Sequence, residues 1–475
     1  MYQNTNYSEE VFGILQENHL LYQLSQALVH VDSNWEDVFE NTQPASPASS
    51  ETVEFETKQL PNEDDLVDID FTVKEQPSGS FTAGIGYGST TKLSLNAGIQ
   101  QNNFLGTGNR LAFNINTISY SRSVNVSYTD PYFTKDAISL GGNVFYNEFD
   151  AGSANLVEYN NKTYGVGVNF GFPINEYVRL NFGLGYKHNG ITRLQTYEQI
   201  QRFYQLYSDP NNPDGGLEFE TFDLTAGISR STLNRGTFPT AGSQQSLSYK
   251  MTTPNSDVNY FKINLDTKWY FPIARGWSVL TRMQLGYGNG YDTINDNDQV
   301  LPFWENFRAG GADTLRGFET NTVGPRAIFR YPSGISGTPD LLSGASCCLG
   351  PDHDVIQASR RSVGGNAIAL AGVELIVPTP FLDEGFSNSV RTSLFVDAGN
   401  VWDTEFQKSD YKDLASQEFD KVADYSDVGR FRASAGLSIQ WLSPMGPMIF
   451  SFAKPLKEED GDDTKFFTFN IGKTF

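Results

Sequence analysis

Apolar and polar residues alternate in segment after segment, from about residue 80 to the end of the chain. Residues 111–117 (LAFNINT) and 178–185 (VRLNFGLG) are examples in which an apolar side chain occupies every second position. Successive side chains of a β-strand point to opposite faces, so this pattern predicts strands with one apolar face and one polar face.

Sixteen segments carry this pattern, an even number, as a closed bacterial outer-membrane barrel requires. They lie near residues 81–88, 92–100, 110–119, 123–131, 137–148, 162–172, 177–188, 219–230, 244–252, 258–272, 278–288, 366–377, 389–397, 429–441, 447–454 and 465–475. We therefore predict an all-β fold, a 16-stranded antiparallel transmembrane β-barrel over residues 80–475.

The connections between these segments differ in length according to parity. Those after even-numbered strands are mostly short and often contain Pro beside an aromatic residue, as in 130–133 (DPYF) and 378–381 (PTPF). Those after odd-numbered strands include 189–218, 289–365 and 398–428. Outer-membrane barrels have short periplasmic turns and long outer loops, whereas a soluble sandwich needs no such asymmetry. The pattern places both termini on the periplasmic side.

Composition narrows the class of protein. Lys and Arg number 34 against 56 Asp and Glu, a net charge of −22, which argues against a nucleic-acid partner. No uninterrupted apolar run approaches the roughly 18 residues of a membrane-spanning helix. The 44 glycines and 13% aromatic residues do not fit disorder.

The first 79 residues differ from the rest. Residues 8–40 have helical apolar spacing after Ser8, and 42–50 form a Pro- and Ser-rich stretch, so residues 1–50 are expected to be an acidic helical leader with a linker. It is either a docking helix on a tether or a leader produced by truncation or fusion. Within 51–79, residues 52–58 and 66–74 alternate around a polar turn and predict a β-hairpin.

The segment 289–365 is too long for a simple connector. Its centre, residues 311–325, reads GADTLRGFETNTVGP. This motif, with 84–88 (GIGYG), 101–108 (QNNFLGTG) and 469–475 (FNIGKTF), resembles the BamA family of outer-membrane-protein assembly factors, in the POTRA-plus-barrel superfamily. The resemblance extends from about residue 51 to the end, and the hairpin at 51–79 looks like the end of the last POTRA domain.

The resemblance makes Leu315, Arg316, Gly317 and Phe318 a loop motif inside the barrel. It implies that Arg316 pairs with acids on the inner wall, which match Glu374 and Asp397. Alternation independently places both acids on the polar, inward face of their strands. A guanidinium can form bidentate bonds with carboxylates, Gly317 permits a tight turn, and Phe318 can wedge against the wall.

A closed barrel must pair its first strand with its last. The first contains three glycines, which weaken strand packing, and the last alternates and ends in an aromatic residue. The glycines either weaken a seam or relieve crowding in a static barrel, and the resemblance favours a lateral gate. The candidate seam residues are Gly84, Gly86, Gly88, Phe467, Phe469, Ile471, Gly472 and Phe475.

Signals for enzyme chemistry are weak. We predict no catalytic site, cofactor or metal site, because no nucleophile elbow, phosphate loop or metal-ligand spacing is present. A barrel lipase would need a wall histidine, for which His188 is the one candidate. Adjacent Cys347 and Cys348 can bond only through a strained eight-membered ring, so a disulfide between them is in doubt.

The resemblance implies folding and insertion of β-barrel proteins into the bacterial outer membrane through the lateral seam, as the central subunit of a barrel-assembly machine. The expected partners are unfolded outer-membrane proteins, outer-membrane lipids and the lipoproteins of that machine. The alternatives are a passive pore and a related translocation module for autotransporters or secreted proteins. A porin would need an open lumen, whereas the long loop is expected to plug it.

Overall fold

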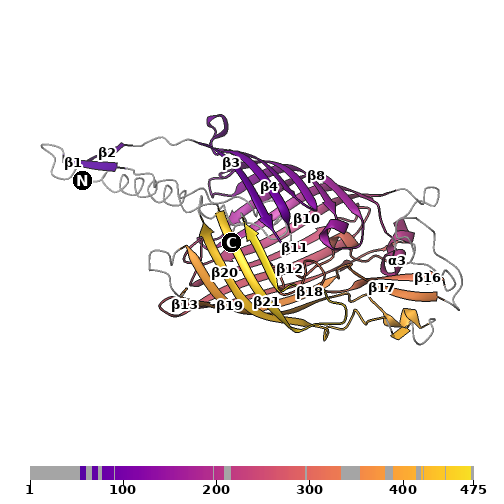
Figure 1. Cartoon of the computed structure of the whole chain (residues 1–475). Helices are drawn as coiled ribbons and strands as arrows, with labels where there is room; N and C mark the ends of the chain where they lie inside the picture. The colour runs from indigo at the N-terminus through magenta and orange to yellow at the C-terminus, as the bar shows by residue number, and fades with distance from the viewer. Residues whose placement is uncertain are drawn as a thin grey trace.

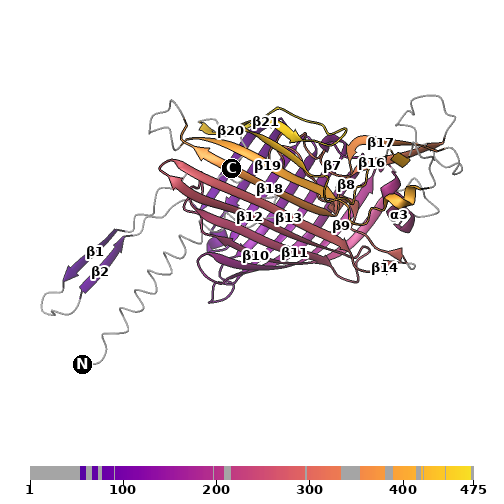
Figure 2. The ribbon, with the colours of Figure 1, turned by 90° about the horizontal axis from the view of Figure 1, so that it is seen from below.

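The computed structural model describes residues 54–59, 67–72, 78–89, 91–195, 197–207, 216–294, 297–332, 354–379, 389–412, 419–420, 422–443 and 446–471. The expected leader (1–50) lies outside these residues, as do Cys347, Cys348, Gly472 and Phe475. Figures 1 and 2 show a barrel seen from two directions.

The barrel is closed and contains sixteen strands, each antiparallel to its neighbours, so the predicted fold is confirmed. The strands are β3 (Gly79–Gly88), β4 (Lys92–Gln101), β5 (Arg110–Ile118), β6 (Ser121–Asp130), β7 (Ser139–Asp150), β8 (Asn160–Pro173), β9 (Val178–Thr192), β10 (Leu217–Ser231), β11 (Gly242–Thr252), β12 (Tyr260–Ala274), β13 (Trp277–Gly290), β18 (Ala367–Val377), β19 (Val390–Trp402), β20 (Arg432–Ser443), β21 (Gly446–Lys457) and β22 (Phe467–Ile471). Each follows its predecessor around the wall, and β22 pairs with β3.

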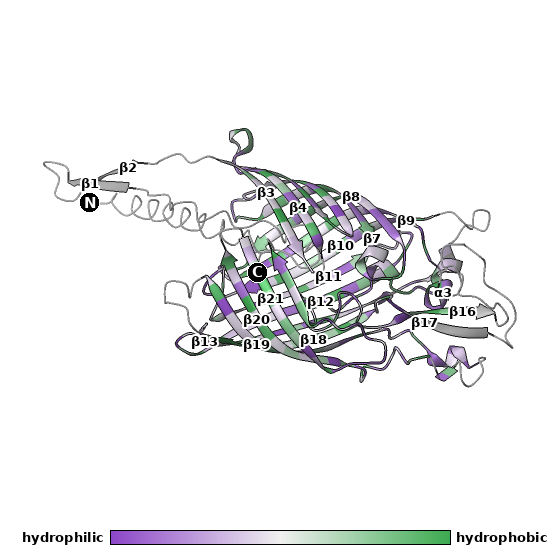
Figure 3. Ribbon diagram, viewed as in Figure 1, coloured by the Kyte–Doolittle hydropathy of each residue, from purple (hydrophilic) through white to green (hydrophobic). Residues whose placement is uncertain are grey.

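The alternating residues of each strand lie on two faces of the barrel wall, one outside and one towards the lumen. In β8, Tyr164, Val166 and Val168 are 43–49% exposed on the outside, while Gly165 and Gly167 between them are buried. Figure 3 shows the same change of hydropathy along many strands. The exposed apolar face suits contact with lipid, and the inner face carries most of the buried polar side chains.

The two ends of the barrel differ. One end has short connections, such as 174–177, 275–276 and 444–445, whereas the other carries 193–216, 291–366 and 403–431. β3 begins at the end with short connections. In the parts of the chain that the structure describes, no helix is long and apolar enough to cross a bilayer.

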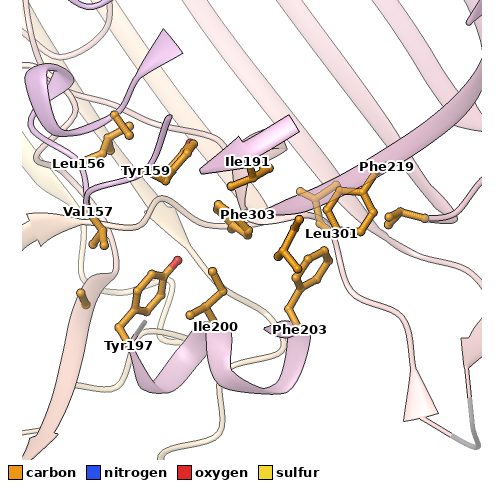
Figure 4. Close-up of a cluster of buried hydrophobic side chains, with 14 of the residues drawn as sticks. Leu156, Val157, Tyr159, Ile191, Tyr197, Ile200, Phe203, Phe219, Leu301 and Phe303 are labelled. Atoms are coloured by element: carbon orange, nitrogen blue, oxygen red, sulfur yellow. The ribbon is translucent and has the colours of Figure 1, made fainter. Parts of the chain in front are cut away.

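A cap of secondary structure that the sequence did not predict lies at the long-loop end (Figure 1). It contains α3 (Glu198–Tyr207) and the antiparallel pair β16 (Arg326–Pro332) and β17 (Asp354–Ser362). Ile200 and Phe203 of α3 are buried with Leu301 and Phe303 from the long loop, as Figure 4 shows. Residues that looked like plain loops thus form a hydrophobic core because segments far apart in sequence supply its sides. Shorter elements of the long loop are β14 (Thr293–Ile294), β15 (Asn297–Asp298) and η3 (Phe303–Glu305).

The hairpin predicted at residues 52–74 is present as β1 (Glu54–Gln59) and β2 (Val67–Thr72), which pair from Glu54↔Thr72 to Gln59↔Val67. Its origin in a POTRA domain remains a prediction.

Candidate functional site

The long connection 291–366 brings its predicted motif onto the inner wall. Leu315 and Phe318 are fully buried, and both belong to a cluster with Ile368, Leu370 and Val401 from β18 and β19. Arg316, between them, is 5% exposed. The motif therefore forms part of the barrel interior.

Arg316 contacts both acids that the sequence singled out. Its Nε and Nη2 donate to the two carboxylate oxygens of Asp397 at 2.6 and 2.9 Å, and Nη2 lies 2.7 Å from Oε1 of Glu374. Asp397 is 1% exposed and Glu374 6% exposed. Although burial lowers the pKa of Arg316, the hydrogen bond to Asp397 and the charge of Glu374 raise it above its ordinary value. A buried guanidinium held by two carboxylates is a strong, geometrically specific anchor.

Three further residues complete this cluster, and the sequence analysis missed them. Arg282 of β13 lies 2.8 Å from Asp397 and donates to the carbonyls of Asp313 and Thr314 in the loop. The guanidinium of Arg316 lies 3.5 Å from the centroid of the Phe395 ring, and Ser393 donates to Glu374 at 3.0 Å.

The position of Arg282 depends on the register of three strands. Gly372 of β18 is the register partner of both Arg282 and Asp397. A Cβ at Gly372 would lie 2.6 Å from Asp397 and 2.7 Å from Arg282, so glycine leaves the space in which they meet. Alternation indicates that Arg282 faces inward, but only the register places it beside Asp397.

Gly317 allows the motif to turn against the wall. Its φ of +90° favours glycine, and a Cβ there would lie 3.1 Å from the Cβ of Ser434 and 3.3 Å from that of Ala453. The backbone of the motif thus lies close to β20 and β21.

The motif also pairs with the connection that leads into β22. The carbonyl of Gly317 accepts from Lys465 N at 3.0 Å, and Glu319 N donates to Asp463 at 2.8 Å. Phe318 forms a β-bridge with Thr464, and the Glu319 carboxylate lies 2.9 Å from Lys465 Nζ. The loop therefore contacts the chain immediately before the last strand.

The contact between β22 and β3 brings several predicted seam residues together. Asn470↔Gly88 and Ile471↔Tyr87 are the residue pairs in the described part of the chain. Ser89 N donates to Phe469 O at 2.8 Å, Phe469 N donates to the Ser89 hydroxyl at 2.9 Å, and the rings of Tyr87 and Phe469 stack at 5.7 Å. Phe467 and Phe469 also stack, at 6.0 Å.

The seam glycines face the lumen, where they make room for asparagines. A Cβ at Gly84 would collide with the side chain of Asn96, and one at Gly88 with that of Asn470. Gly86 is buried between the exposed residues Ile85 and Tyr87. Relief of crowding on the inner face therefore explains part of the glycine content of β3.

The wall histidine that a barrel lipase would need lies beside an aromatic ring and a carboxylate. His188 stacks on Tyr164 at 4.8 Å between ring centroids and lies 4.0 Å from Glu220. Within the described residues, no group of three or more His, Cys, Asp or Glu side chains could hold a metal ion.

Comparisons with known proteins agree with this geometry. The Omp85 superfamily domain matches residues 103–475. A crystal structure of BamA from Haemophilus ducreyi lacking POTRA domains 1–3 is 38% identical, with a TM-score of 0.75, and the match covers 89% of this chain and 75% of that one.

Two BamA proteins of other bacteria are less similar in sequence to this chain. Outer membrane protein assembly factor BamA of Neisseria meningitidis serogroup B is 29% identical over 437 residues, 90% of this chain and 50% of that protein. BamA of Nitratidesulfovibrio vulgaris is 22% identical over 438 residues, 88% of this chain and 45% of that protein. The chain thus spans about half the length of these relatives. With its closed barrel and inner-wall loop motif, the chain belongs to the Omp85 superfamily and, within it, to the BamA family of the bacterial outer membrane.

Proposed function

We propose that this barrel folds and inserts β-barrel proteins into the bacterial outer membrane, as the central subunit of a barrel-assembly machine. The observation that carries the proposal is the contact of the Arg316 loop motif with both the inner wall and the chain entering β22, beside the contact of β22 with β3. These contacts support an effect of the loop on the seam.

In this proposal an incoming strand pairs at the opened seam. A strand edge presents unpaired backbone N–H and C=O groups onto which another strand can add. The substrates are unfolded outer-membrane proteins, the surrounding lipids take part, and the lipoproteins of the machine are further partners. Both termini face the periplasm, which is consistent with the long connections at the opposite end.

The proposed activity involves binding and pairing of strands, without a chemical reaction or a cofactor. The alternatives are a passive pore and a translocation module for autotransporters or secreted proteins. The loop that crosses the interior argues against a wide pore, because Leu315, Phe318 and their neighbours are packed inside the barrel.

Reconstitution separates these functions. The full chain is placed in lipid vesicles and supplied with an unfolded outer-membrane barrel protein. Folding of this substrate is followed by the change in its electrophoretic mobility in samples that are not heated. We expect faster folding than in empty vesicles, with little ion conductance. Conductance without accelerated folding would identify a pore, and transport of a secreted partner without folding would identify a translocation module.

A further inference from the structure

A second ionic cluster holds the long loop on a different part of the inner wall. Glu305, at the end of η3, lies 2.7 Å from Nζ of Lys250 on β11 and 3.5 Å from Nζ of Lys262 on β12. The Tyr260 hydroxyl donates to the same carboxylate at 3.0 Å, and Lys262 donates to the Glu305 carbonyl at 2.8 Å. Both the side chain and the backbone of Glu305 are thus anchored.

Glu305 supplies the carboxylate that balances the charge of Lys262 in this cluster. Asp223 of β10 lies 2.8 Å from Lys187 and 3.8 Å from Lys250, but Lys262 has its ion pair with Glu305. Although burial raises the pKa of Glu305, Lys250 and then Lys262 lower it below its ordinary value, so the carboxylate is ionised at neutral pH. Neutralising Glu305 would leave Lys262, whose side chain is 12% exposed, without this carboxylate partner.

The two anchors have opposite polarity and hold the loop on different strands of the wall. At the first, the loop supplies Arg316 and β18 and β19 supply carboxylates. At the second, the loop supplies Glu305 and β11 and β12 supply lysines. The loop is therefore fixed at two places on the wall, on β11 and β12 and on β18 and β19, which only β13 separates in the strand order.

The segment between the anchors is held in a fixed conformation. Phe307 exchanges two backbone hydrogen bonds with Gly365, at 2.8 and 3.1 Å, and Ala309 accepts one from Val323 at 3.1 Å. Gly310 N donates to the Thr314 hydroxyl at 2.9 Å. Before Glu305, Phe303 packs in the core of the cap (Figure 4). A shift at Glu305 would thus be transmitted towards Arg316.

We infer that Glu305 is a positioning residue, which fixes the long loop on the lysines of β11 and β12 so that Arg316 reaches its carboxylates on β18 and β19 and the motif reaches the chain entering β22. This inference rests on the proposed function. Glu305 acts through Arg316 and makes no contact with a substrate in this role.

The test compares Glu305→Gln, Arg316→Gln and the double variant in the vesicle folding assay. We expect Glu305→Gln to slow folding of the substrate about twofold to thirtyfold, the range that corresponds to the coupling energies found when coupled positions are changed. The double variant should be no slower than Arg316→Gln, because Glu305 has nothing left to position. Multiplied effects would show that the residues act separately and would overturn the inference.

A matched control removes an exposed ion pair between the same loop and the connection from β7 to β8. Glu158→Gln breaks the pair with Arg361, whose side chains are 51% and 41% exposed, and should leave the folding rate unchanged. Glu305→Asp, which keeps the carboxylate, should restore part of the rate, whereas an equal loss in both variants would count against an ionic role. If Glu305→Gln does not fold, Lys262→Met replaces it in the same comparison.

The same data separate the two proposals. If Arg316→Gln slows folding and Glu305→Gln does not, the inference fails and the proposed function stands. If neither variant of a folded barrel changes the rate, the function proposed for the loop fails as well. Protease cleavage of the loop gives a readout without substrate: Glu305→Gln should accelerate cleavage near the motif, and unchanged cleavage would contradict positioning.

Discussion

The wall from β8 to β13 and the contact between β22 and β3 are built from the same alternating strands but are held differently. β8 and β9 pair from Asn160↔Thr192 to Pro173↔Arg179, whereas the described part of the β22–β3 contact contains Asn470↔Gly88 and Ile471↔Tyr87. At the second site, the Ser89 hydroxyl, the Tyr87–Phe469 stack and the loop-bound Lys465 add to the backbone pairing. Strands of the first region pair over long registers, whereas the described pairing at the second is short and is supplemented by side chains and the loop.

Covalent closure of the seam should have the largest effect. Gly88→Cys with Asn470→Cys places two cysteines at directly paired positions, where a disulfide would keep β22 on β3. We expect the oxidised protein to lose substrate folding almost completely and the reduced protein to recover it, in the vesicle assay.

The control disulfide is placed in the wall from β8 to β13, between two strands that pair over many residues. Thr267→Cys with Met283→Cys joins β12 to β13 at paired positions. Because that contact is not expected to open, oxidation should leave folding unchanged. Full activity of the locked seam, or equal loss in both proteins, would remove the proposed difference between the two regions.

Reversal of the charge of Arg316 should have the second-largest effect. Arg316→Glu places a third carboxylate beside Asp397 and Glu374, and breaking a buried ion pair costs about 3–5 kcal/mol. We expect a folded barrel whose loop is rapidly cleaved by protease and whose activity is strongly reduced. Arg361→Glu, at an exposed pair, should cost less than about 1 kcal/mol. Equal protease resistance in both would contradict the role of Arg316.

Gly317→Ala should have an intermediate effect. A non-glycine residue at its φ of +90° costs about 1–3 kcal/mol, and the new Cβ would crowd Ser434 and Ala453. Gly108→Ala is the matched control, since Gly108 has a φ of +78° and nothing within 4 Å of its Cβ position. The difference between the thermal unfolding temperatures of the two variants measures crowding at the motif. Equal unfolding temperatures would mean that Ser434 and Ala453 move enough to accommodate the new methyl group.

Lys465→Met should have the smallest effect. Lys465 forms an ion pair with Glu319, and the two side chains are 24% and 29% exposed, so the pair stabilises the fold by at most about 1 kcal/mol. Hydrogen exchange at the Ser89 amide, which donates to Phe469, should be moderately faster in the variant, while amides of β12 are unchanged. Unchanged exchange at Ser89 would show that the loop does not support this end of the seam.

The sequence predicted the barrel well because a wall with lipid on one side and a polar lumen on the other imposes alternation on every strand. It also predicted that Arg316, Glu374 and Asp397 belong together, through motif position and strand phase. It missed α3 and the β16–β17 pair, because short segments in a long connection are stabilised by partners such as Phe203 and Phe303 from separate loops.

By itself the sequence determined strand number, strand phase and the inward direction of the acids, since these follow from local alternation. Only the tertiary structure decided which further inward residues meet the loop and these acids. Arg282 reaches Asp397 across Gly372 because three strands share one register, and Glu305 reaches Lys250 and Lys262 because the loop crosses the lumen. Register and loop path depend on contacts between distant segments, which no local pattern records.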